Sequence, residues 1–415
     1  MNPLKKRRDY SYYNSYNSGR GRIRKDRVLI VGVIGAILVV GLLVLLNLTR
    51  IKLLWKGYSL GESSEILSLT DEQESEILSH DKMDHILDWI KLSKEVSFYD
   101  EYEKYLGYYP KMEKEEVIAY IDEVFTSQVP KLKSLGYTET TIWDLLKNAS
   151  NEDLQYLVDK GYTAQEIENY RKVTGYVIQN THLYMDSYKE NKDYNYSVNI
   201  VNYPFIIASN GVTDTYTIDN PEEVLTLVKK GFFLPSTYEP ADLTTPNIPI
   251  SPECEDAQMT KATATALEEM TTAADKEGYK LVLNSAYRSY DRQQAVYQEF
   301  ETKYGGLYAA EYVAAPGASE HQTGLGIDLT SQSVLDGERL VFGDTSEYQW
   351  VLKNAHEYGF IVRFDTETAD ITGIAHEPWH LRYVGKEVAK EIYDKGWTFE
   401  EYCLYNNVIP KVTKN

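Results

Sequence analysis

An uncharged run near the N-terminus, Val28 to Leu48 (VLIVGVIGAILVVGLLVLLNL), constrains this 415-residue chain more than any other feature. A helix of about 20 apolar residues crosses the hydrocarbon part of a bilayer. The apolar part of a cleaved signal peptide is shorter, about 7–15 residues, and precedes a small-residue cleavage site. This run is longer and ends in LNLTRIK. We therefore predict one transmembrane helix at residues 28–48, with a cleaved signal peptide as the alternative.

The charges on the two sides of this run predict its orientation. Residues 1–27 contain nine lysines and arginines and two aspartates, a net charge of +7. Because the whole chain has a net charge of −20, residues 28–415 have a net charge of −27. Because cationic flanks stay in the cytoplasm, we expect a single-pass cell-membrane protein with a cytoplasmic N-terminus and an extracellular remainder. An exterior this acidic argues against nucleic-acid partners. The basic tail is rich in Tyr, Asn, Ser and Gly, and we expect it to be disordered.

The first extracellular segment, residues 49–196, is polar and helical in pattern, and we predict a helical spacer domain. It contains two GYT triplets, which begin at Gly136 and Gly161. In each triplet the glycine is expected to end one helix and the threonine to cap the next. Three histidines of this segment, His80, His85 and His182, lack ligand spacing, and we interpret them as ordinary surface or core residues.

The composition changes near residue 197, where β-branched and aromatic residues appear. We interpret residues 197–250 as a lead-in arm and linker. The stretch PEEVLTLVKKG is expected to form a short helix ending at Gly231, and five prolines within residues 235–252 predict an extended chain after it.

Residues 251–411 alternate between helical and strand-like patterns, which predicts an α+β catalytic domain built on a small antiparallel sheet with flanking helices. Strands are expected at YKLVLNSAY, GLGIDLT, FIVRF and HLRYV. The expected helices are at 258–277, 290–303, 346–357 and 386–395.

The string HEPWH, His376 to His380, matches H-E-x-x-H, a zinc motif that requires a helix. Pro378 removes a backbone donor and disfavours helical geometry at Glu377. The neighbouring residues are β-branched, aromatic and glycine-punctuated, as in strands. The helical zinc motif is therefore disfavoured, and Pro378 is expected to make a turn that aims Glu377 and His380 at one centre.

Two further clusters lie in the same domain. In SEHQTGLGID, Asp328 lies in an apolar strand, where a carboxylate is costly to bury unless a metal or a hydrogen-bond partner neutralises it. In NSAYRSYDRQQ, Arg288 ends a strand beside a helix start, which suits binding of a carboxylate or an oxyanion. From the residues alone, a metal site and a buried hydrogen-bonded acid both remain open for Asp328.

The pattern Ser319-x-His321-x-x-Gly324-x-Gly326-x-Asp328, followed by Glu377-x-x-His380, is similar to the motifs S-x-H-x-x-G-x-A-x-D and E-x-W-H. These motifs belong to zinc D-alanyl-D-alanine carboxypeptidases of the VanY type, relatives of the D-Ala-D-Ala dipeptidases. SAYRS and GFFLPSTYEPADL also resemble that family. The likeness covers roughly residues 222–395, and Gly326 departs from it because alanine is usual there.

The resemblance implies a Zn²⁺ cofactor held by His321, Asp328 and His380, with Glu377 as the general base. It also implies that Arg288 contacts the substrate. Three further residues would help to bind or shape the substrate site: Gln293, Ser319 and Tyr287. The implied substrates are peptidoglycan stem peptides ending in D-Ala, from which the terminal D-alanine is removed.

Several alternatives remain open. The family's L,D-carboxypeptidase branch shares these motifs and acts on tetrapeptide stems, and a non-catalytic wall-binding scaffold is a further possibility. A distant alternative is a helical zinc site of His376, His380 and Glu400. We interpret His376 as structural or as a neighbour of the ligands, and His356 as a helix-end histidine. A disulfide between Cys254 and Cys403 is permitted outside the cell but not required.

Overall fold

The structure, a computed structural model, describes residues 25–93, 95–207 and 214–415. The chain divides into two compact units, Met1–Lys131 and Leu132–Asn415. Most of the predicted disordered tail therefore lies outside the described residues. The spacer at 49–196, the arm at 197–250 and the catalytic domain at 251–411 stay predictions as separate domains.

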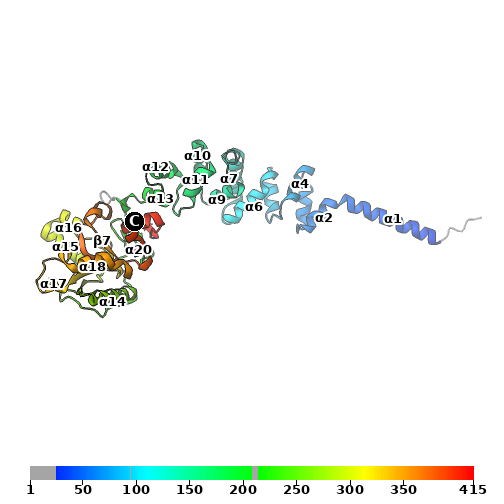
Figure 1. Cartoon of the computed structure of the whole chain (residues 1–415). Coiled ribbons are helices and arrows are strands. Elements are labelled where there is room, and N and C mark those ends of the chain that lie inside the picture. The colour runs from blue at the N-terminus through cyan, green and yellow to red at the C-terminus, as the bar shows by residue number, and fades with distance from the viewer. Residues whose placement is uncertain (1–24, 94, 208–213) are drawn as a thin grey trace, which may run out of the picture. The chain divides into compact units, whose positions relative to one another are not determined.

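The first unit is helical and begins with α1 (Lys25–Leu46), the long helix drawn in blue in Figure 1. Within it, Leu29–Leu46 has a mean hydropathy of 3.2, which makes α1 long and apolar enough to cross a membrane. A signal sequence near an N-terminus can pass the same test of length and composition. The other helices are α2 (Leu48–Trp55), α3 (Leu60–Ile66), α4 (Asp71–Ser79), α5 (Ile86–Leu92), α6 (Tyr99–Tyr108) and α7 (Lys114–Ser127), and α8 (Val129–Ser134) spans the division between the units.

The second unit continues with helices and confirms the reading of the GYT triplets. Gly136 and Gly161 adopt positive φ angles of 86° and 67°. Thr138 and Thr163 then cap the next helices through their side-chain oxygens. The two turns are in contact, because the Tyr137 hydroxyl donates to the Tyr162 carbonyl at 2.9 Å. The helices are α9 (Glu139–Leu146), α10 (Asn151–Lys160), α11 (Ala164–Arg171), α12 (Thr181–Asn191) and α13 (Tyr194–Asn202).

One prediction in the arm is wrong. Residues 221–230 form consecutive turns and not a helix. Their backbone carbonyls instead accept hydrogen bonds from a buried side chain, because Arg382 donates to the carbonyls of Val224 and Thr226. Lys229 points inward, with only 6% of its surface exposed. Tertiary contacts thus override the local helical pattern.

The predicted small antiparallel sheet is confirmed. It has four strands in the order β5-β6-β8-β7, and all neighbouring pairs are antiparallel. The strands are β5 (Leu281–Ser285), β6 (Gly326–Ser331), β7 (Phe360–Phe364) and β8 (Glu377–Tyr383). β8 contains the EPWH residues, so the exclusion of a helical zinc motif is also confirmed.

Four helices of this domain lie at the predicted positions, and four others, at 306–312, 332–335, 369–372 and 399–406, were not predicted. Figure 1 shows several of these helices around β7. The first of them, α14, is followed by the expected glycine stop, Gly278, which has a φ of 91°. The helices are α14 (Lys261–Lys276), α15 (Tyr290–Tyr304), α16 (Gly306–Tyr312), α17 (Gln332–Leu335), α18 (Ser346–Asn354), α19 (Ala369–Thr372), α20 (Lys386–Lys395) and α21 (Phe399–Asn406).

Two short sheets tie the arm to the rest of the unit. One has the order β2-β1-β9, from β1 (Tyr216–Ile218), β2 (Phe232–Phe233) and β9 (Val412–Lys414). The other pairs β3 (Leu243–Thr244) with β4 (Met259–Thr260). Because β1 pairs with β9, the arm and the C-terminal residues of the chain are held together.

The two cysteines belong to different apolar cores. Cys254 is partly buried against the core under the four-stranded sheet, whereas Cys403 is fully buried in a second core formed with α20 and α21. Both are free thiols. The structure therefore does not contain the disulfide that the sequence permitted.

Candidate metal centre

Strand register places the first two candidate ligands beside each other. Asp328 on β6 is paired directly with His380 on β8 and, on its other side, with Ser285 on β5. Paired residues of neighbouring antiparallel strands present their side chains to the same face. The carboxylate and the imidazole therefore meet, with Asp328 Oδ1 at 2.9 Å from His380 Nδ1.

The third candidate ligand, His321, comes from the 3₁₀ helix η4 (Glu320–Thr323) just before β6. Gly324 ends η4 in the left-handed conformation with a φ of 65°, which turns the chain sharply into the strand. His321 is thereby brought back over Asp328, with its Nε2 atom 3.4 Å from Asp328 Oδ2.

The three side chains form a compact and buried group. One ligand atom from each of His321, Asp328 and His380 lies within 4.8 Å of the others, and among the described residues no other set of His, Cys, Asp and Glu does this. Burial alone would raise the pKa of Asp328, but the two histidines hold that pKa well below its usual range. An ionised carboxylate with two imidazoles is a donor set that suits zinc.

The outer nitrogen of each histidine is also occupied, which tests whether the group fits a metal. His321 Nδ1 donates to the Ala286 carbonyl at 2.6 Å, so Nε2 is left to face the centre. His380 Nε2 lies 3.2 Å from the Glu320 carboxylate, so the other nitrogen, Nδ1, faces the centre of the group. Metal-binding histidines nearly always have such a partner for the second nitrogen. The residues therefore fit a metal ion.

Glu377, the first residue of β8, lies near the same group, since its carboxyl interacts electrostatically with His380 and Asp328, and the pairing of β8 is irregular there. The pairs Val362 with Leu381 and Phe364 with Glu377 show that two steps along β7 correspond to four along β8. This bulge takes the place of the turn that we expected at Pro378. Burial raises the pKa of Glu377 to about 7, while His380 and Arg288 act to lower it. A carboxylate with a pKa near neutrality is suited to accept and return a proton.

Arg288 does not end the strand as expected but lies three residues after β5, in the segment before α15, and is held in place by neutral partners. Its Nη1 donates to Gln293 Oε1 at 3.0 Å and its Nη2 donates to Ser285 Oγ at 3.1 Å. Gln293 is itself fixed, because its amide donates to the Ala314 carbonyl at 2.7 Å. Gln293 therefore orients Arg288, and a guanidinium that has no carboxylate among these partners is available for an anionic substrate group.

The other predicted site residues border the same region. Ser319 immediately precedes η4 and is 4% exposed. Tyr287 precedes Arg288, and its backbone N–H donates to the Gln258 carbonyl. Burial raises the pKa of Tyr287, with Glu239 and Asp256 adding to the effect, so its hydroxyl stays neutral. His376 is exposed and lies outside the three-residue group.

The remaining histidines match the sequence reading. His356 lies in η6 (Ala355–Tyr358), at the end of α18, and stacks on Tyr393 with 3.8 Å between ring centroids. His80, His85 and His182 contact Glu76, Glu103 and Tyr156, respectively.

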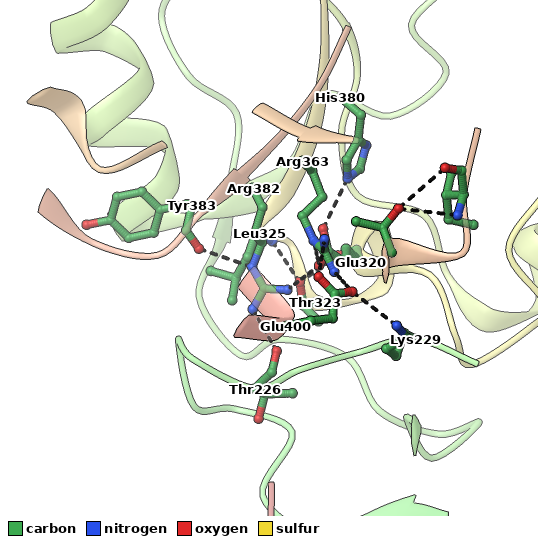
Figure 2. A network of polar contacts seen from close by, with 12 residues as sticks. Thr226, Lys229, Glu320, Thr323, Leu325, Arg363, His380, Arg382, Tyr383 and Glu400 are labelled. Atoms are coloured by element: carbon green, nitrogen blue, oxygen red, sulfur yellow. Dashed lines mark hydrogen bonds and ion pairs between the residues drawn. The ribbon is translucent and has the colours of Figure 1, made fainter. Parts of the chain in front are cut away.

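The sequence reading missed a buried charged network behind His380, which Figure 2 shows. Glu320, between Ser319 and His321, is 4% exposed and faces the strand residues Arg363 and Arg382. Burial alone would raise the pKa of Glu320, but Arg363 and Arg382 hold that pKa well below its usual range. A signal was present, because FIVRF and HLRYV each place an arginine inside an apolar strand, as GLGIDLT does an aspartate.

The network also explains Glu400, which we had weighed as a ligand of a helical zinc site. Glu400 is fully buried on α21 and accepts hydrogen bonds from Arg363 and Lys229. Its carboxylate is thus committed to two cations.

Known proteins resemble this part of the chain. A family model described as VanY, D-alanyl-D-alanine carboxypeptidase, matches residues 256–386. "Putative carboxypeptidase YodJ" of Bacillus subtilis (strain 168) is 48% identical over 190 residues, which cover 45% of this chain and 69% of that protein.

Two solved structures are similar in sequence. The LdcB LD-carboxypeptidase is 46% identical, with a TM-score of 0.44, and the match covers 47% of this chain and 92% of that one. The vancomycin resistance D,D-pentapeptidase VanY in complex with Zn(II) is 30% identical, with a TM-score of 0.37, and the match covers 43% of this chain and 98% of that one.

Proposed function

This chain belongs to the VanY family of D-alanyl-D-alanine carboxypeptidases, and we propose that it is a zinc D,D-carboxypeptidase that removes the terminal D-alanine from peptidoglycan stem peptides. One observation carries the proposal. His321, Asp328 and His380 converge within 4.8 Å, and each histidine has a partner for its outer nitrogen. Three protein ligands leave one zinc position open, as in catalytic zinc sites.

The neighbouring residues have distinct roles in this proposal. Bound zinc would supply a water molecule of lowered pKa. The Glu377 carboxylate would take a proton from the attacking water and return it to the leaving amine. Arg288 would bind the terminal carboxylate of the peptide, held in place by Gln293 and Ser285. Ser319 and Tyr287 would shape the substrate pocket.

We also propose where the enzyme works. Helix α1 would anchor it in the cell membrane with the basic N-terminus inside, because the flanking charges follow the positive-inside pattern. The catalytic residues would then face the cell wall. External protease on intact cells should remove the catalytic part from an anchored protein. A soluble secreted protein beginning near Thr49 would contradict the anchor.

The activity is tested by incubating the full-length protein, purified in a mild detergent, with synthetic stem peptides. Mass spectrometry should show loss of one D-alanine from a pentapeptide ending in D-Ala-D-Ala, and none after treatment with a chelator. Cleavage of a tetrapeptide stem alone would identify the L,D-carboxypeptidase branch, whose motifs are the same. Binding of both peptides without cleavage would identify a scaffold.

A further inference from the structure

The metal centre has a charged support on one side. His380 Nδ1 faces Asp328, and its Nε2 faces Glu320 Oε2 at 3.2 Å. Both nitrogens of His380 thus face a carboxylate. A metal ion bound at this centre would take the place of the proton on Nδ1, while Glu320, which as an ionised carboxylate only accepts hydrogen bonds, would keep the proton on Nε2. The imidazole is also packed against Phe364, with 5.1 Å between ring centroids.

Glu320 is itself held by two arginines. Its Oε1 atom accepts a hydrogen bond from Arg363 Nε at 2.9 Å and lies 3.2 Å from Arg382 Nη1. Its Oε2 atom is the one that faces His380. The two oxygens therefore have separate tasks, one as an anchor and one as the contact to the histidine.

The anchor continues to α21 and to the turns of the arm. Arg363 donates to both oxygens of Glu400, at 2.9 and 2.7 Å, a fork that fixes the guanidinium in its plane. Glu400 also accepts from Lys229 at 3.2 Å. Arg382 donates to the carbonyls of Val224 and Thr226, both at 2.9 Å. Figure 2 shows the contacts of Lys229, Glu400, Arg363, Glu320, Arg382 and Thr226 as one connected path.

Five charged side chains in this path are buried: Lys229, Glu320, Arg363, Arg382 and Glu400. Removing ions from water is costly, and a buried ion network is often no more stable than apolar residues of the same volume. Stability alone is therefore a weak reason for the network. Among the described residues, the hydrogen bond between Glu320 and His380 joins this network to the proposed metal ligands.

We propose that Glu320 is a positioning residue for His380, and that Arg363 and Glu400 hold Glu320 in place. Glu400 and Lys229 lie outside the family match at residues 256–386. Helix α21 and the turns around Lys229 would then be part of the support of the metal centre. This inference rests on the proposed zinc site.

The test measures zinc affinity of the full-length protein by competition with a chromophoric chelator. Glu320→Gln keeps the shape of the side chain but removes the charge, and we expect a loss of about 10–100-fold, the usual cost of removing such a partner. Glu320→Asp keeps the charge for the arginines but shortens the reach to His380, so it should also bind zinc more weakly. Glu400→Gln should cause a smaller loss.

A matched control is Glu269→Gln, because Glu269 pairs with Lys386 at 2.8 Å on the surface. Zinc affinity should be unchanged in this variant. A second measurement uses cobalt in place of zinc, since its visible spectrum reports ligand geometry. The cobalt bands should shift in Glu320→Gln and Glu320→Asp and stay unchanged in Glu269→Gln.

The outcomes separate the two proposals. If the unmodified protein binds no zinc, the proposed function fails. If it binds zinc, but a folded Glu320→Gln variant has the same affinity and cobalt spectrum, the positioning role is overturned. If Glu320→Gln does not fold, Glu320→Asp and Glu400→Gln decide in the same way. Failure of all three to fold with excess zinc would overturn the proposal in favour of a purely structural network.

Discussion

The two histidines of the metal centre are supported in different ways. His321 donates to the carbonyl of Ala286, a neutral backbone group on the segment that follows β5. His380 faces Glu320, which belongs to a buried network reaching Arg363 and Glu400. The orientation of one imidazole is thus fixed by a neighbouring backbone carbonyl, and that of the other by a network of distant charges. We therefore expect the His380 side of the centre to respond to mutations far from it, and the His321 side not to.

The largest effect should come from removing a proposed ligand, and it should be the same whether the ligand is on the His321 side or on the His380 side. His321→Ala, Asp328→Ala and His380→Ala should each abolish stoichiometric zinc and activity, because one of three ligands costs more than any neighbour. Zinc content by elemental analysis, together with peptide cleavage, checks this. Full zinc occupancy in His380→Ala would contradict the ligand assignment.

The second largest effect should come from replacing the proposed base, Glu377, which should leave the surroundings of both histidines unchanged. Glu377→Gln keeps the shape of the side chain but cannot accept a proton at neutral pH. Turnover should fall by about 10²–10⁴-fold, the usual contribution of a general base, while zinc content and binding of a D-Ala-terminated peptide are kept. Steady-state kinetics and zinc analysis on one sample measure both. Near-normal turnover with zinc bound would make Glu377 dispensable and His376 the next candidate.

The third effect concerns stability, and it should come from the charged network on the His380 side. Glu400→Gln leaves Arg363 and Lys229 without their carboxylate, and breaking a buried ion pair costs ~3–5 kcal/mol of unfolding free energy. Glu269→Gln removes a carboxylate that is 51% exposed, and such pairs are worth about 0–1 kcal/mol. Denaturant unfolding of the two variants compares them directly. Equal stability would show that the network carries little energy.

Arg288→Ala should affect substrate and not metal. Its backbone N–H donates to the His321 carbonyl at 3.3 Å, which the substitution keeps. A hydrogen bond to a charged partner is worth about 1.5–3 kcal/mol, so both peptide affinity and turnover should fall by about 10–150-fold. Isothermal titration with the product peptide, together with zinc analysis, tests this. Loss of zinc instead of peptide affinity would assign Arg288 to the support of His321.

The smallest effect is expected at Gly326, where the family usually has alanine. A Cβ atom there would come within 3.0 Å of the backbone C and the Cβ of Glu320. Gly326→Ala should therefore push η4 slightly and weaken zinc binding by less than the ~10-fold lower limit expected for Glu320→Gln. The chelator competition measures the shift. A loss as large as that of Glu320→Gln would show that the position of η4 matters more than the charge of Glu320.

The ligand set came from the resemblance to the family motifs and stays a prediction, whereas local signals in the sequence predicted the strands that carry it. Asp328 is a lone acid in an apolar strand, Pro378 excludes a helix, and the four strands and their helices follow simple periodicity. The support of His380 was missed, because no local pattern marks Glu320 and its partners lie 43 or more positions away, as Arg363 does. The helix predicted at 221–231 failed for the same reason, since Arg382 binds its backbone from a distant strand.

The central claim is that zinc binds between His321, Asp328 and His380, and anomalous diffraction at the zinc edge from crystals grown with zinc tests it most directly. We predict one anomalous peak bonded to His321 Nε2, an Asp328 carboxylate oxygen and His380 Nδ1, at about 2.0–2.2 Å. His380 Nε2 should remain against Glu320. A peak bonded to His380 Nε2, or one at His376 with none between these three residues, would contradict the account.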